Sequence, residues 1–121
     1  MYTGTYRNPR HTVRTVLNVD TLEGIQVGHL IALNVENCQL RPLIARVLNS
    51  SNNELEIVWL EGSYTGVWKI AKKKDGRTLV DWTDIVPKQS VLLFDFELTK
   101  TNRLQKATVQ HLKAAYSQLD A

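Results

Sequence analysis

The sequence has neither a pair of cysteines for a disulfide nor the N-terminal pattern of a secretion signal. Its single cysteine, Cys38, has no second cysteine with which to pair, and the N-terminus lacks the charged-then-apolar pattern of a signal peptide. We therefore expect an intracellular protein, nuclear or cytoplasmic. Its apolar runs are short, as at residues 91–94, and stay well below the roughly 18 residues of a membrane span. No membrane partner is predicted.

The residue sets of common catalytic and metal sites are also missing. Cys38, His11, His29 and His111 are scattered along the sequence, whereas zinc needs four such ligands at close spacing. No nucleophile elbow and no Gly-rich phosphate loop occurs. Carboxylate pairs such as Asp81 with Asp84 are the residue types of acid–base catalysis, but such spacings are common on strands and turns. We expect no enzymatic activity, no metal and no cofactor.

The overall composition indicates one soluble globular domain. Hydrophobic residues make up 43% and charged residues 22% of the 121 positions, which are ordinary values for a folded protein. The net charge of +3, from 15 basic and 12 acidic residues, permits an anionic partner without identifying one. Residues 1–26 are rich in Thr, Asn and Arg and are predicted to form an arm or linker.

Short strands separated by turn residues fill the middle of the chain, residues 27–98. In residues 55–59 the side chains of Leu55, Ile57 and Trp59 fall on one face of a strand because strand side chains alternate. Asp75–Gly76 is a strong hairpin signal. Residues 82–87 predict one tight turn, helical in character, which Pro87 ends. Further strands are predicted at residues 30–36, 43–48, 67–70, 78–82 and 90–98. This spacing favours a small barrel.

Residues 99–121 change to a helical period. Asn102 is the predicted N-cap of an amphipathic helix. Its apolar stripe must be buried, and we favour burial on its own barrel over docking into a partner. The stripe consists of Leu104, Thr108, Leu112, Ala115, Tyr116 and Leu119.

Four aromatic residues, Trp59, Tyr64, Trp68 and Trp82, gather around a turn that contains Gly62 and Gly66, although only 7% of the sequence is aromatic. Such a group forms either a structural core or a partly exposed pocket for a flat or cationic ligand. Trp59 and Trp82 are interpreted as core residues. Tyr64 and Trp68 flank the turn and are expected near the rim, where a binding role is as plausible as a structural one.

A basic segment surrounds the predicted hairpin tip. It contains Lys69, Lys72, Lys73, Lys74 and Arg77. The simpler interpretation is a solvated hairpin end that also discourages edge pairing. The alternative is a contact with nucleic acid, which would weaken steeply with salt.

The order of predicted strands resembles the SH3-like barrels of the Tudor and chromo-barrel group. The resemblance rests on Val27-Gly28-His29-Leu30-Ile31-Ala32 opening the first strand, Trp59 ending the third, and a turn ending in Pro87 before the last strand. It covers roughly residues 27–98. It implies a five-stranded barrel and an aromatic cage that reads methylated lysine or arginine, for example on a histone tail. Loop 36–40 has no aromatic residue, so the implied ligand-binding residues are Trp59, Tyr64, Trp68 and Trp82, with Glu61, Asp81 or Asp84 as carboxylate partners.

The sequence therefore predicts a mostly β, five-stranded SH3-like (Tudor-like) barrel with a C-terminal α-helix at residues 99–121. We expect a non-enzymatic interaction module within a chromatin-associated or regulatory protein. It is predicted to bind a peptide through the aromatic surface. Nucleic-acid binding by the basic hairpin and docking through the C-terminal helix are the alternatives.

Overall fold

The computed structural model describes residues 24–35 and 41–120. Most of the predicted N-terminal arm and loop 36–40, together with Cys38 and His11, lie outside the described residues. The elements are β1 (Leu30–Leu33), β2 (Ile44–Ser50), β3 (Glu54–Glu61), β4 (Lys69–Ile70), β5 (Lys72–Asp75), β6 (Thr78–Asp81), β7 (Thr83–Pro87), a 3-10 turn η1 (Lys88–Ser90), β8 (Val91–Phe96) and α4 (Lys106–Asp120).

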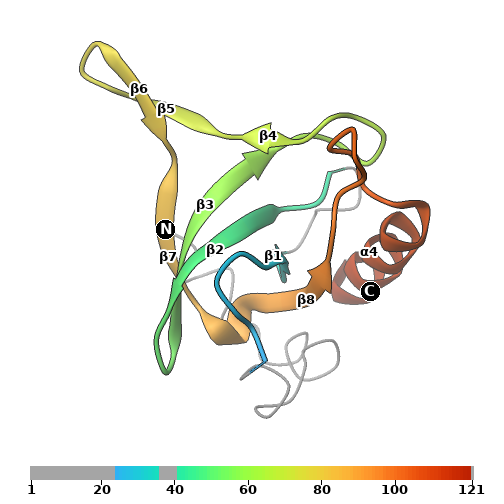
Figure 1. Ribbon diagram of the computed structural model, residues 1–121. Helices are drawn as coiled ribbons and strands as arrows, with labels where there is room; N and C mark the ends of the chain where they lie inside the picture. The colour runs from blue at the N-terminus through green and yellow to red at the C-terminus, as the bar shows by residue number, and fades with distance from the viewer. Residues whose placement is uncertain (1–23, 36–40, 121) are drawn as a thin grey trace.

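The described part of the chain is mostly β sheet with a C-terminal helix, as the sequence predicted (Figure 1). The main sheet has the order β4-β3-β2-β1-β8, and β7 pairs with β3 beside this path. All of these pairs are antiparallel. Within the described ranges no pairing joins β8 to β7 or β4, so the sheet is not closed. The five-stranded barrel and the boundaries at residues 27–98 and 99–121 stay predictions.

Strand β3 pairs with β2 along one edge, and its other edge is shared by two partners, β7 and β4. Its first part pairs with β7, from Glu54 opposite Pro87 to Val58 opposite Thr83, and its last two residues pair with β4. Trp59 lies at the division. Its backbone N–H donates to the carbonyl of Trp82 (2.8 Å), its carbonyl accepts from Ala71 N–H (2.8 Å), and Trp82 N–H donates to the Ala71 carbonyl (2.9 Å). Strands β5 and β6 leave the sheet at this junction as a separate two-stranded ribbon, which we call the arm (residues 72–81; Figure 1).

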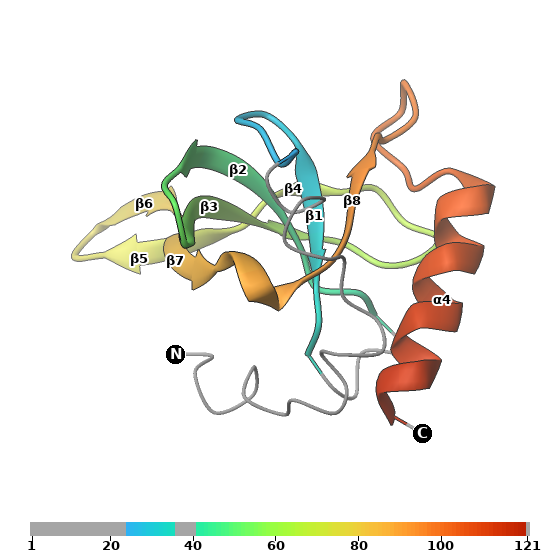
Figure 2. The ribbon, with the colours of Figure 1, turned by 90° about the horizontal axis from the view of Figure 1, so that it is seen from below.

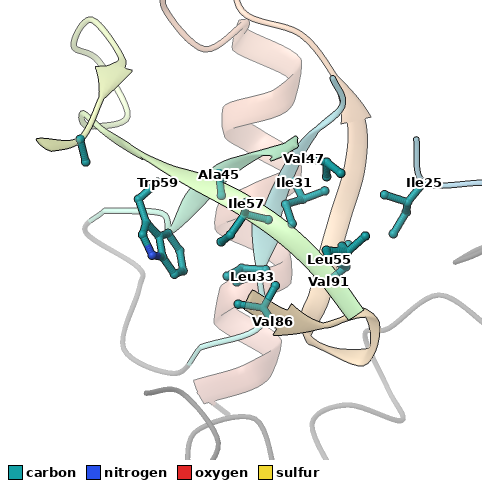
Figure 3. Close-up of a cluster of buried hydrophobic side chains, with 11 residues drawn as sticks. Ile25, Ile31, Leu33, Ala45, Val47, Leu55, Ile57, Trp59, Val86 and Val91 are labelled. Atoms are coloured by element: carbon teal, nitrogen blue, oxygen red, sulfur yellow. The ribbon is translucent and has the colours of Figure 1, made fainter. Parts of the chain in front are cut away.

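One face of the sheet holds the inner cluster. Figure 3 shows side chains from β1, β2, β3, β7 and β8 converging there, among them Ile31, Ile57 and Val86. Ile31 and Ile57 are fully buried. Alternation in β3 places Leu55, Ile57 and Trp59 together in this cluster, as the strand period predicts.

The other face is covered by α4 (Figure 2). Leu112, Tyr116 and Leu119 of the helix are fully buried, because residues three and four apart lie on one face of a helix. They pack in the helix-facing cluster with sheet residues such as Ile44 and Leu60. The favoured burial of the stripe on the domain itself is therefore confirmed.

Two local predictions are wrong. Thr83–Pro87 is not a turn but strand β7, because pairing with β3 across Leu55 and Val86 buries Val86 to 1% exposure. The helical turn follows Pro87, at Lys88–Ser90. Asn102 is not the N-cap of α4, which begins at Lys106. It lies in the preceding turn with φ of 61°, a conformation that asparagine tolerates better than most residues.

Candidate functional site

The two aromatic residues expected near a binding rim are buried. Tyr64 is 7% and Trp68 3% exposed. The Trp68 ring lies over Gly62, where an added Cβ would stand 2.4 Å from Cδ2, and its Nε1 donates to the Ser63 carbonyl at 2.9 Å. Gly62 thus makes room for the indole, and both rings become part of the helix-facing cluster. The rim placement of Tyr64 and Trp68 is wrong.

Trp59 and Trp82 differ in their exposure to solvent. Trp59 is 4% exposed and belongs to the inner cluster, as expected. Trp82 is 45% exposed, because it lies where the chain returns from the arm (β6) to the main sheet (β7), so its placement in the core is wrong. The sheet separates Trp59 from Tyr64 and Trp68, and the four rings do not line one cage.

The proposed carboxylate partners have local contacts. Glu61 is exposed and lies 3.7 Å from Lys69 Nζ. Asp84 accepts a hydrogen bond from the backbone N–H of Ile85 at 2.8 Å, and Asp81 pairs with Lys72. A ligand-binding role for the aromatic residues, Glu61 or Asp84 stays a prediction.

The basic residues do come together, on the arm and at its base. Lys69, Lys72, Lys73, Lys74 and Arg77 are all exposed. The Asp75–Gly76 signal is confirmed, since Gly76 opens a two-residue loop with φ of 65°. Lys72 forms an ion pair with Asp81 and Lys69 with Glu61. Among the residues that the structure describes, Lys73, Lys74 and Arg77 have no such partner.

The arm also exposes apolar side chains that sequence reasoning did not assign to a surface. Leu79 is 62% exposed and lies directly opposite Lys74. At the base, Ile70 is 40% and Trp82 45% exposed. A two-stranded ribbon outside the main sheet has no second layer on either face. The sequence did contain a signal for this surface. A two-residue turn at Gly76 fixes the register of the hairpin and thereby sets Lys74 opposite Leu79 and Lys73 opposite Val80.

Metal and membrane features are not found in the described ranges. Residues 24–35 and 41–120 contain no group of three or more His, Cys, Asp or Glu side chains placed to hold a metal ion. No helix in this part of the chain combines the length and apolar character needed to cross a membrane.

Residues 25–120 match the family model described as the NIPBL cohesin loader C-terminal domain. The chain belongs to this family. It is 33% identical over 114 residues to Nipped-B-like protein of Homo sapiens and of Mus musculus, covering 94% of this chain. It is 36% identical over 95 residues, 78% of this chain, to Nipped-B-like protein B of Danio rerio. The chain spans 3–4% of the length of these relatives. No solved structure gives a significant match.

Membership in the cohesin loader C-terminal family corrects the resemblance to Tudor and chromo-barrel domains. That resemblance rested on strand spacing and aromatic positions, which unrelated small β domains share. The family match does not support methyl-lysine reading. Its description is that of a loading factor and names no reaction.

Proposed function

We propose that this domain is a non-enzymatic protein-binding module of a cohesin loader, acting on chromatin in the nucleus, and that the arm is its contact surface. Family membership supports a protein partner, namely cohesin or a protein associated with it. Helix α4 is a weaker candidate for the contact surface, because its apolar stripe is already buried against the sheet of its own domain.

The observation that carries the proposal is the exposure of Leu79 on the arm and of Trp82 at its base, together with the position of Lys74 directly opposite Leu79. Leu79 projects beside Lys74, and Trp82 stands at the base of the arm. Exposed aromatic and aliphatic side chains framed by charges are typical of interface anchors. The complementary partner surface has an apolar pocket with acidic residues around it. The basic arm does not favour binding of a histone tail, because the tail is also basic and like charges repel.

Binding of purified cohesin to immobilised wild-type and variant chains tests the proposal. Leu79→Ser and the double variant K73E/K74E should each weaken binding about tenfold or more, which corresponds to the loss of about 1.4 kcal/mol. Val67→Ser and K100E/K106E are matched controls, since Val67 is 49% exposed away from the arm and both control lysines are exposed. Equal binding by the arm variants and the wild type would contradict the proposal.

Nucleic acid is the second candidate, supported by the lack of ion pairs at Lys73, Lys74 and Arg77 in the described residues. A two-stranded ribbon can enter the major groove of DNA. Three phosphate contacts would give log K against log salt a slope of about −2.7. Fluorescence anisotropy with a labelled DNA duplex at several salt concentrations measures this slope. A slope near zero, or no loss on K73E/K74E, would exclude this candidate.

A further inference from the structure

A second charged surface lies at the end of β7 away from the arm. A pocket of about 260 Å³ is lined there by Asn49, Ser50, Ser51, Glu54, Glu56 and Ile85. We call it the acidic pocket. Its lining includes one large apolar side chain, Ile85, which is 52% exposed and lies directly opposite Glu56 in the β3–β7 register.

The carboxylates of the acidic pocket are available for a partner. Glu54 and Glu56 are both exposed, and neither forms an ion pair within the part of the chain that the structure describes. Lys88 follows Pro87 nearby, but its side chain is only 7% exposed. This end of the sheet therefore presents uncompensated negative charge around an exposed isoleucine.

The arm complements the acidic pocket in charge and in apolar character. Leu79 is an exposed apolar side chain. Lys74 lies directly opposite it in the β5–β6 register, and Arg77 is in the loop that joins the two strands. Placed in the pocket, Leu79 would cover Ile85 while the two cations would face Glu54 and Glu56. Apolar contact with opposite charges around it is the pattern of a specific interface.

The arm of one chain does not reach its own acidic pocket. Figure 1 shows the arm at one end of β7 and the β2–β3 turn, beside which the pocket lies, at the other end. Ile85, which lines the pocket, lies four positions after Asp81 at the end of the arm, or about 13 Å along an extended strand at roughly 3.3 Å per residue. The arm extends away from the pocket (Figure 1). A second copy related by a two-fold axis beside β7 would bring each arm to the other copy's pocket.

We propose that two copies of this chain associate by seating the arm of each in the acidic pocket of the other. Such a contact is reciprocal, so it closes as a dimer and does not continue into a filament. The inference shares the arm with the proposed function but not its partner. Self-association and partner binding would therefore compete for Leu79.

Sedimentation of the chain over a range of concentrations tests the dimer. Wild type should shift from monomer to dimer as concentration rises, and 1 M salt should weaken the association because it shortens the screening length to about 3 Å. K74E/R77E and E54K/E56K should each raise the dimer dissociation constant at least about tenfold. K100E/K106E changes the same number of exposed cations elsewhere and should dimerise like the wild type.

Mixing the two charge-reversed variants is the decisive step. K74E/R77E has a negative arm and a negative pocket, whereas E54K/E56K has a positive arm and a positive pocket. Each should be monomeric alone, and an equimolar mixture should form a heterodimer, since both contacts then join opposite charges. A monomeric wild type at all concentrations, or a mixture that stays monomeric, would overturn the inference.

The outcome separates this inference from the proposed function. E54K/E56K retains its arm, so it should bind cohesin at least as well as the wild type does. Loss of the dimer with retained cohesin binding would support both statements. A dimer without any cohesin binding would leave the self-association standing and refute the partner.

Discussion

The Tyr116 hydroxyl donates a hydrogen bond to the Leu33 carbonyl oxygen at 2.7 Å, joining α4 to β1 across 83 positions of sequence. The Tyr116 hydroxyl oxygen in turn accepts a hydrogen bond from Leu43 N–H at 3.3 Å. One fully buried hydroxyl thus fixes the helix to the chain on both sides of loop 36–40. Docking of α4 is therefore specified by a polar contact as well as by apolar packing.

Tyr116→Phe should destabilise the domain by about 1–2 kcal/mol. The substitution keeps the ring in the helix-facing cluster but leaves the Leu43 N–H without this acceptor, and an unsatisfied buried group is costly. Urea unfolding followed by circular dichroism measures the effect. Ser117→Ala, an exposed change on the same helix, should leave the midpoint nearly unchanged; a similar loss in both variants would argue against the hydrogen bond as the cause.

Trp68→Ala and Trp82→Ala should differ strongly in stability. Trp68 is 3% exposed and its Nε1 is hydrogen bonded, so its truncation should cost about 3–5 kcal/mol. Trp82 is 45% exposed, and its truncation should cost clearly less. Denaturant midpoints of the two variants provide the comparison. Comparable losses would show that Trp82 contributes to the core despite its exposure.

Gly62→Ala should destabilise the domain by about 1–3 kcal/mol. Its Cβ would stand 2.4 Å from the Trp68 indole, and overpacking of a well-filled core forces side chains to move. Gly66→Ala is the matched control. There the nearest atom is the Ser63 hydroxyl, at 2.7 Å, which can rotate away, so a smaller thermal shift is expected. A Gly62→Ala variant as stable as wild type would contradict the close packing.

Gly76→Val should loosen the arm without unfolding the sheet. Gly76 has φ of 65°, which a β-branched residue adopts only with strain. Amide hydrogen exchange should rise in Lys72–Asp81, while β3 and α4 keep their protection. Binding to cohesin should weaken in parallel. Faster exchange throughout the chain would instead indicate that the arm supports the whole fold.

Local periodicity predicted much of the fold. The helical stripe through Leu112 and Tyr116, the alternation of β3 and the Asp75–Gly76 hairpin are all present, because each depends on neighbours close in sequence. Strand β7 was missed because its strand character comes from pairing with β3, some 30 positions earlier.

The candidate site was harder to predict than the fold. The burial of Trp68 depends on the cover that α4 provides through residues such as Leu112 and Tyr116, which lie far outside residues 59–68. The exposure of Trp82 depends on where the arm leaves the sheet. The spacing of the aromatic residues along the sequence does not determine which of their rings α4 covers.

The junction at Trp59 gives the arm a mechanical property. Three backbone hydrogen bonds link Trp59, Ala71 and Trp82 in a closed ring, and the Trp59 side chain is set in the inner cluster. Both strands of the arm are thus tied directly to the centre of the sheet, without an intervening flexible loop. A force applied to the arm would therefore be transmitted to these three hydrogen bonds and, through Trp59, to the inner cluster.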